Sequence, residues 1–449
     1  MNPTNPMDPT NPMDPAPALA RVPARVRAAD ADRAAVPAML AGAALLALLP
    51  AVLSPGLLNA ANQMLIAVLF ASAFNVLAGQ SGMLAFGHAA YFGIGAFATI
   101  HAMNALGGEG LLPTPLLPVF GLLAGGALGV AAGWFSTQRT GVYFSMITLA
   151  LAELIHALAP HLKEVFGGEA GVSSMRMPAW GLDFGSSLQV YYLTLAWVSA
   201  CLALLFFFTR TPVGRLALGL RENGHRLKFL GYNVHALRLL VFVVSSAFAG
   251  VAGGLQAMAN ESANYVLFDV RLSSEVVLNA YIGGVGVFFG PALGAALMTL
   301  FGYFVSDLTR SWLLYQGILF VLIMMYLPTG LSGLLPWWRA HSRHQPAGRL
   351  ARLAALSLLA GALLLAGTVL SVELLQRVFA QDYQAQLAAG QAWPAVAFLG
   401  RDWLPGAPST WLLPLALLAA GSLAARAAAR RWQEAGDAAP AAGDGGPTP

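Results

Sequence analysis

The chain has 449 residues, of which 57% are hydrophobic and only 10% are charged, with a formal net charge of +4 at pH 7. A soluble protein of this length needs many more charged side chains to cover its surface, so the composition excludes a soluble globular protein and indicates that most of the surface faces lipid. The basic residues stand at the ends of apolar runs, which argues against nucleic-acid binding. The single cysteine, Cys201, excludes an internal disulfide and a metal site built from cysteines.

The first 35 residues are rich in proline and open with two copies of the hexamer Thr-Asn-Pro-Met-Asp-Pro. Proline at this density breaks a helix, so residues 1–35 are predicted to form a disordered tail. Four arginines then precede the first apolar run, which begins at Val36.

Apolar runs of spanning or near-spanning length follow one another along the chain. They lie at 36–53, 59–78, 86–105, 115–134, 141–159, 188–208, 239–258, 275–289, 291–307, 311–328, 353–373 and 411–426. If both termini are cytoplasmic, the loops on that side hold 18 of the 24 Lys and Arg residues. The sequence therefore predicts an all-α, polytopic integral membrane protein with about 10–12 transmembrane helices, N-in and C-in. The runs 275–289 and 291–307 are short and meet at Gly290-Pro291, which favours half-helices or strongly tilted spans.

The longest basic loop between spans covers residues 209–234. Pro212 suits a helix start, leucines then recur at helical spacing among charged residues, and Gly231 suits the end of the helix. This pattern predicts a short amphipathic helix that could lie in the groove of a partner protein. The alternative is a charged loop that only fixes the membrane topology.

Two glycine-rich segments carry polar groups near membrane depth. The first, residues 79–96, holds Gln80, Ser81 and His88, which could line a transport pathway or be satisfied structural groups. The second follows Asn279 and contains three glycines in four positions, Gly283, Gly284 and Gly286. Such glycines could unwind a membrane helix at a binding site, and close helix packing is the competing explanation.

Glu153 lies inside the apolar run 141–159, with His156 three residues further on. A carboxylate at this depth must face protein or water, either in a proton relay or as a paired structural acid. No motif for enzymatic chemistry or for a metal accompanies it. A phosphate-binding loop needs a lysine after a glycine, whereas Lys163 and Lys228 both follow leucine, so the chain is predicted to bind no nucleotide itself.

Four segments give the chain a family resemblance: residues 74–96, 143–153, 221–234 and 282–291. In these segments it resembles the permease subunits of high-affinity branched-chain amino-acid ABC transporters, in particular the LivM type. The resemblance covers residues 36–336 and implies an inner-membrane importer subunit. Its implied partners are membrane lipid, a LivH-like second permease, two cytosolic ATPases that bind ATP, and a periplasmic substrate-binding protein.

The resemblance also assigns roles to residues. It implies that the basic loop is the coupling helix that docks on an ATPase, with Arg221, Glu222, Asn223, Arg226 and Gly231 as its key residues. We expect the translocation pathway to be bordered by a set drawn from the polar and glycine-rich segments: Gln80, Ser81, His88, Glu153, Asn279, Gly283, Gly284 and Gly286. No cofactor is expected in the chain itself.

Residues 337–449 have no counterpart in the usual permease. We expect an extension at 337–428 with two candidate spans, followed by a disordered cytoplasmic tail at 429–449. Near residue 166 the chain also departs from the family's usual Thr-Gly-Gly pattern. The extension could be a packing element, a docking surface or a regulatory addition.

Other functions remain open at this stage. The cargo could be urea, an amide or another small zwitterionic or apolar solute instead of a branched-chain amino acid. A proton-coupled secondary transporter working alone through Glu153 and His156, or a scaffold that only assembles partners, would also fit the composition.

Overall fold

The structure is a computed structural model. It describes residues 37, 39–107, 112–307, 309, 311–327, 329–334, 347–389, 393–398 and 401–437. The chain forms two compact units, residues 1–300 with 328–332 and residues 301–327 with 333–449. The tail predicted at 1–35 lies outside the described residues.

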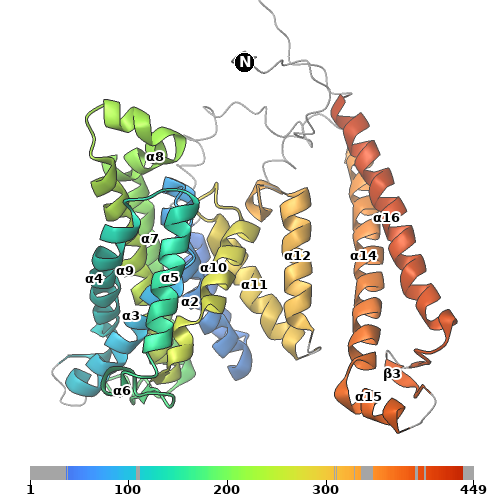
Figure 1. The fold of residues 1–449 in the computed structure, drawn as a ribbon, viewed down its shortest axis with the longest axis horizontal. Coiled ribbons are helices and arrows are strands. Elements are labelled where there is room, and N and C mark those ends of the chain that lie inside the picture. The colour runs from blue at the N-terminus through green and yellow to red at the C-terminus, as the bar shows by residue number, and fades with distance from the viewer. Residues whose placement is uncertain are drawn as a thin grey trace, which may run out of the picture. The chain divides into compact units, whose positions relative to one another are not determined.

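The first unit is a bundle of helices (Figure 1). Its main elements are α2 (Pro55–Asn75), α3 (His88–Ala102), α4 (Pro118–Ser136), α5 (Val142–Leu158), α6 (Lys163–Phe166), α7 (Ser187–Arg210), α8 (Pro212–Phe229), α9 (Val234–Asn260), α10 (Val270–Gly283) and the start of α11 (Gly290–Ser306). Short 3-10 or π-helical turns occur at Leu49–Ala51, Val76–Gln80, Met103–Gly107, Thr114–Leu116, Tyr265–Phe268 and Leu331–Gly333.

Helix α2 forms the centre of this bundle. Its side chains are buried on all sides, including Leu65, Leu69 and Phe74, which are almost fully enclosed. Helices α7, α9 and α10 pack around it. A helix that is apolar all round belongs in the interior of a membrane protein, so the other spans shield α2 from lipid.

Helix α9 packs closely against α3 and α4 because glycines remove the side chains between them. A Cβ atom at Gly125 of α4 would meet the Ser246 carbonyl of α9, and one at Gly95 of α3 would overlap the backbone of Gly250. Small residues that let helix backbones approach closely drive helix association within a bilayer. These glycines therefore allow α9 to lie close to α3 and α4.

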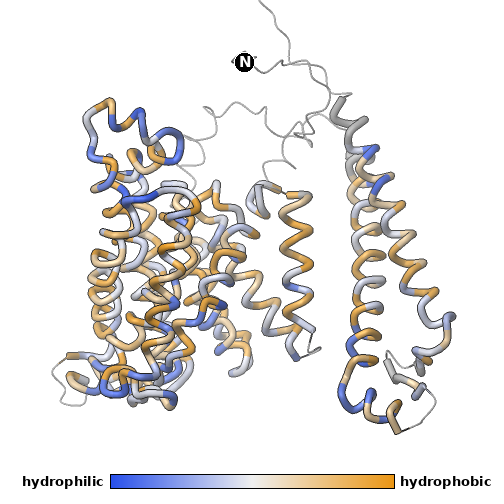
Figure 2. The backbone as a smooth tube through the Cα atoms, viewed as in Figure 1, coloured by the Kyte–Doolittle hydropathy of each residue, from blue (hydrophilic) through white to orange (hydrophobic). Residues whose placement is uncertain are grey.

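The described helices have the lengths and polarity of membrane spans. Seven are long and apolar enough to cross a membrane: Pro55–Gln80, His88–Gly107, Thr114–Ser136, Ser187–Arg210, Val234–Asn260, Ala351–Val378 and Pro408–Trp432. Four shorter apolar helices lie at Met39–Ala51, Val142–Leu158, Gly290–Ser306 and Trp312–Met325. Figure 2 shows apolar residues along the middle of the first unit and polar residues at α8 and at the opposite end. The all-α polytopic fold is confirmed, while the N-in, C-in orientation stays a prediction.

The end of the first unit opposite α8 is closed by a short antiparallel sheet. Strand β1 (Val172–Ser173) pairs with β2 (Ser262–Ala263), which directly follows α9. Arg176 lies beside it and donates hydrogen bonds to the carbonyls of Met258 and Ala259, in the last turn of α9. A cation bound to the final carbonyls of a helix compensates its dipole, so Arg176 fastens this end of the bundle.

The second unit contains α12 (Trp312–Tyr326), α14 (Ala347–Val378), α15 (Gln381–Ala388), the hairpin of β3 (Val396–Phe398) and β4 (Arg401–Trp403), and α16 (Pro408–Asp437). Helices α14 and α16 form a close pair, in which Gly367 packs on Leu418 and Gly421 packs on Leu364. The two spans expected in the extension are therefore present as helices. The tail predicted from residue 429 is wrong in its first part, because α16 continues to Asp437 through alanines and other strong helix formers.

Polar contacts join α14 to α12 within this unit. The Ser311 hydroxyl donates a 2.6 Å hydrogen bond to Gln376 Oε1, and the Tyr315 hydroxyl donates a 3.1 Å hydrogen bond to Glu373. The side chain of Glu373 is buried at 8% exposure, so its carboxylate depends on Tyr315 for a partner. The extension is thus hydrogen-bonded to a helix of the predicted permease region.

Candidate functional site

Helix α2 is broken at the glycine-rich segment that the sequence singled out. Its last turn is π-helical at Val76–Gln80, and the chain then leaves the helix at Gly82 with a φ of +71°, which favours glycine. Ser81 is buried and its hydroxyl donates to the Leu77 carbonyl at 2.6 Å. Residues 82–87 then form a non-helical segment that runs down to the start of α3.

This segment is held against α5 by hydroxyl groups. The Ser145 hydroxyl donates to the Leu84 carbonyl at 2.5 Å, and the Phe86 amide donates to Thr148 Oγ1 at 3.3 Å. Irregular backbone at membrane depth is tolerated where protein surrounds it or where it lines a cavity. Hydrogen bonds to Ser145 and Thr148 of α5 therefore stabilise the non-helical segment after α2.

A second break separates α10 from α11. Helix α10 ends at Gly283, Gly284 has a φ of +101°, and the chain is non-helical until α11 begins at Gly290. Gly283 and Gly294 pack backbone to backbone, so the two helices lie too close for side chains at these positions. The structure divides 275–307 into two helices, but the break comes before Gly290-Pro291, which instead starts α11. The choice between half-helices and tilted spans stays open.

The two breaks lie against each other. A Cβ atom at Gly79 would meet the Val285 carbonyl, and Asn75 Nδ2 lies 3.5 Å from the Phe288 carbonyl, across 213 residues of sequence. The buried Asn279 of α10 has a side-chain oxygen with no hydrogen-bond partner among the described residues. Discontinuous helices of this kind form the binding sites in many transporter folds.

Helix α8 lies across the end of the bundle (Figure 1). As predicted, it starts at Pro212, and it is followed by Gly231 with a φ of +87°. The kink within α8 was not predicted: Asn223 is non-helical, and its side chain accepts a hydrogen bond from the Arg226 amide, so it caps a second short helix.

Arg221 connects α8 with the first break. Its Nη1 donates a 2.7 Å hydrogen bond to the Gly79 carbonyl, in the π-helical turn at the end of α2. The stem of Arg221 also packs 3.1 Å from the site where a Cβ at Gly82 would lie. Arg221 therefore binds its own chain, although it is exposed like Glu222 and Arg226.

Two large apolar side chains at the end of α8 are strongly exposed. Phe229 is 91% exposed and Leu230 is 66% exposed, and both stand among basic residues such as Lys228. These two side chains were not predicted from the sequence. The sequence does contain a signal for them, because two large apolar residues follow a charged helix directly before the glycine that ends it.

His88 occupies the core of the first unit. Its Nε2 lies 2.8 Å from the Ser245 hydroxyl, which in turn donates to the Ala73 carbonyl at 2.7 Å. Phe74 and Tyr91 surround the ring edge-on, and the side chain has no exposed surface. Through Nε2, His88 ties α3, α9 and α2 together, whereas its Nδ1 is buried without a hydrogen-bond partner among the described residues. Its place in a pathway stays a prediction.

Glu153 points away from the rest of the chain. It is exposed on α5, next to exposed Leu154, and forms no hydrogen bond or ion pair within the described residues. His156 instead lies beside the ring of Tyr265, with 5.8 Å between ring centroids. The structure thus brings Ser81, Gly283 and Gly284 to the region of the breaks, but leaves Glu153 on an outer face.

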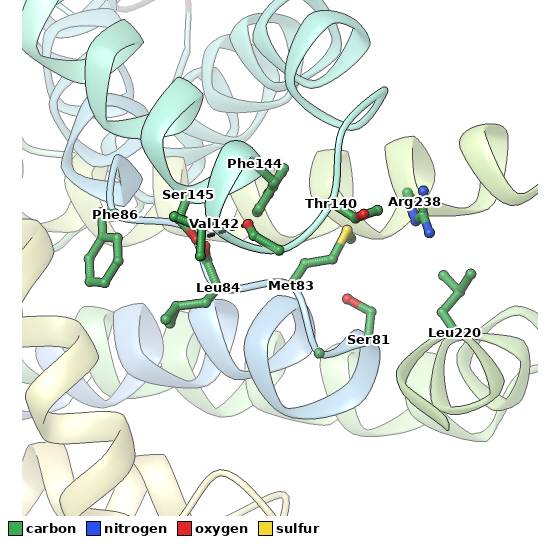
Figure 3. A pocket seen from close by; sticks show the side chains of 12 residues that line it. Ser81, Met83, Leu84, Phe86, Thr140, Val142, Phe144, Ser145, Leu220 and Arg238 are labelled. Carbon is green, nitrogen blue, oxygen red and sulfur yellow. Dashed lines mark hydrogen bonds between the residues drawn. The ribbon is translucent and has the colours of Figure 1, made fainter. Parts of the chain in front are cut away.

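A cavity of about 410 Å³ opens below α8. Figure 3 shows side chains of the 82–87 segment, such as Met83, opposite Val142 and Phe144 of α5, with Leu220 of α8 and Arg238 of α9 at one end. Ser81 is thus the one predicted pathway residue that lines this cavity in the described part of the chain.

The fold and the site define a polytopic membrane permease with discontinuous helices. Residues 56–327 match the family described as "Branched-chain amino acid transport system / permease component", and the chain belongs to that family. It is a multi-pass protein of the inner membrane. Helices α14 to α16 lie beyond the matched residues.

Curated relatives are permeases of branched-chain amino acid transport systems. The chain is 29% identical to the high-affinity branched-chain amino acid transport system permease protein LivM of Escherichia coli strain K12, over 65% of this chain and 72% of the relative. It is 26% identical to the probable LivM of Methanocaldococcus jannaschii, over 54% of this chain and 77% of that relative. It is also 24% identical to LivH of Escherichia coli strain K12, over 59% of this chain and 90% of that relative. No solved structure matches the chain.

Proposed function

We propose that this chain is one permease half of an ATP-driven importer for branched-chain or related amino acids, and that α8 transmits the motion of separate ATPase subunits to the broken end of α2. The observation that carries the proposal is the 2.7 Å hydrogen bond from Arg221 of α8 to the Gly79 carbonyl. An exposed helix fixed to an unwound segment can move that segment when a partner moves the helix.

The surface of α8 suits a protein partner. Phe229 and Leu230 are exposed, and Glu222, Arg226 and Lys228 provide charged groups around them. Apolar anchors inside a charged rim are typical of helices that dock in a groove. Arg226 and Glu222 serve here as rim contacts to an ATPase, and Asn223 and Gly231 set the shape of the docking segment.

The outer face of α5 suits a second, LivH-like permease. A carboxylate on a lipid-facing surface is costly, so exposed Glu153 fits a site covered by protein or facing water between two permeases. In this arrangement the pathway runs along that face and past the breaks at Gln80, Ser81 and Gly284. A periplasmic binding protein would deliver the amino acid at the end near β1.

The chain itself supplies no chemistry in this proposal. ATP is bound and hydrolysed by the ATPase subunits, and the permease needs no cofactor of its own. Its residues only open and close a path through the membrane. The spans contain few ionisable groups, which suits a zwitterionic or apolar cargo.

The proposal is tested by affinity purification of the chain from membranes that contain the complete transport system. The double variant Phe229→Ala with Leu230→Ala is compared with Arg139→Ala, which changes an exposed residue of another loop at the same end. We expect the double variant to lose the ATPases and the control to retain them, with both eluting as folded protein on size exclusion. Retention of the ATPases by the double variant would refute the docking role of α8.

A further inference from the structure

The cavity below α8 lies between four segments of the chain. Its walls come from the 82–87 segment, the start of α5, α8 and α9. With a volume of about 410 Å³ it falls in the range of small-molecule sites. Of the residues that line it, only Ser81 belongs to the pathway proposed above.

One end of the cavity carries a positive charge. Arg238 is half-buried there and forms no hydrogen bond or ion pair with any described residue. Thr140 and Ser81, which also line the cavity, add hydroxyl groups. A guanidinium removed from much of its water and left without an anion is unfavourable, and it prefers carboxylate or phosphate partners.

The other end is apolar. Leu84, Phe86 and Phe144 line it, away from Arg238 (Figure 3). The lining as a whole therefore matches a ligand with an anionic group on an apolar body. A small aliphatic carboxylate and an anionic lipid share this chemistry.

Arg238 also lies under the kink of α8. Its Nη2 is 3.3 Å from the site where a Cβ at Gly224 would stand, directly after the non-helical Asn223. A ligand bound to Arg238 would therefore touch the base of the kink and the 82–87 segment at once. Such a ligand would resist relative motion of these two elements.

We infer that this cavity is a regulatory binding site for an anionic group, carboxylate or phosphate, on an apolar body. The ligand holds α8 to the 82–87 segment and so slows transport. Entry from the cytoplasm rests on the proposed orientation, but binding itself does not depend on it. For this reason the test uses nanodiscs, in which both faces of the protein are accessible.

The experiment measures binding to the purified full chain by native mass spectrometry and calorimetry. The carboxylate probe is 4-methylpentanoate, added to nanodiscs of phosphatidylcholine, and the lipid probe is phosphatidylglycerol incorporated in their bilayer. We expect saturable binding of one or both probes, weakened about tenfold or more by Arg238→Gln and much less by Arg238→Lys. Arg215→Gln, on the exposed side of α8, is the matched control and should bind as the unaltered chain does.

A second variant keeps the test decisive if Arg238→Gln does not fold. Thr140→Trp changes an exposed residue at the rim of the cavity and keeps the arginine in the chain, and the larger side chain should also block binding. Carboxylate binding alone identifies a soluble ligand, and phosphatidylglycerol binding alone identifies a lipid. The inference would be overturned if neither probe bound saturably to the unaltered chain. It would also be overturned if Arg238→Gln and Thr140→Trp both bound the probes as tightly as the unaltered chain does.

Discussion

Arg221 of α8 and Gly79 of α2 are joined by a 2.7 Å hydrogen bond between the guanidinium and the glycine carbonyl. The carbonyl belongs to the π-helical turn that ends α2, and Gly79 also lies against Val285 in the second break. Arg221 therefore ties the exposed helix to the first unwound segment, at the glycine that packs against the second. In the proposed mechanism, this hydrogen bond transmits movement of α8 to the end of α2.

The glycines between α4 and α9 offer a test of the packing. A Cβ at Gly125 would lie 2.6 Å from the Ser246 carbonyl, so Gly125→Ala should destabilise the protein by about 1–3 kcal/mol. At neighbouring Gly126 a Cβ would meet only Ala247 at 3.5 Å, an ordinary contact. Gly126→Ala should therefore be neutral or stabilising by up to about 1 kcal/mol. Thermal unfolding in detergent measures both, and equal effects would contradict the close packing of α4 on α9.

The orientation can be tested with single cysteines. Native Cys201 is buried, whereas Phe229 and Met175 are 91% and 79% exposed, near opposite ends of α9. We expect a membrane-impermeant maleimide to label Phe229→Cys in inverted vesicles and Met175→Cys in intact spheroplasts. The reverse pattern would place α8 outside the cell and contradict its proposed contact with cytosolic ATPases.

Glu153 distinguishes the ATP-driven importer from a proton-coupled transporter. Because Glu153 forms no hydrogen bond with His156 among the described residues, we expect no proton relay between them. Glu153→Gln in the assembled system should keep ATP-dependent leucine uptake within about threefold. Uptake by the purified chain alone that is driven by a pH gradient and abolished by this variant would support the stand-alone transporter instead.

The contact between Tyr315 and Glu373 predicts that the extension stabilises α12. A double-mutant cycle with Tyr315→Phe and Glu373→Gln should give a coupling free energy of about 0.5–2 kcal/mol, the range of polar contacts between membrane helices. The matched cycle uses Tyr303→Phe, because the Tyr303 hydroxyl has no hydrogen bond in the described part of the chain. A coupling free energy near zero between Tyr315 and Glu373 would mean that this hydrogen bond does not stabilise the packing of α14 on α12.

Local rules explain which elements could be predicted from the sequence. Pro212 and Gly231 bracket α8 because their backbone preferences act within a few residues. The glycines at 283, 284 and 286 indicated the break between α10 and α11 for the same reason. The long apolar runs identified the spans because the bilayer demands such lengths.

The site itself depends on contacts between distant segments, which the sequence does not reveal. Arg221 was predicted to dock on an ATPase, and only the folded chain shows it bonded to Gly79, 142 residues away. Glu153 and His88 are both polar residues in spans, yet packing leaves one exposed and the other enclosed by aromatic rings. The cavity at Arg238 likewise draws its walls from four separate segments.

The most direct test of the account is the coupling of ATP hydrolysis to uptake in Arg221→Ala. The assembled system is reconstituted in proteoliposomes, and leucine uptake and ATP hydrolysis are measured together, with Arg139→Ala as the control. We predict that Arg221→Ala keeps its ATPases bound but loses about tenfold or more of its uptake per ATP hydrolysed, because the link to Gly79 is cut. Unchanged uptake per ATP in Arg221→Ala would show that α8 does not drive the break in α2.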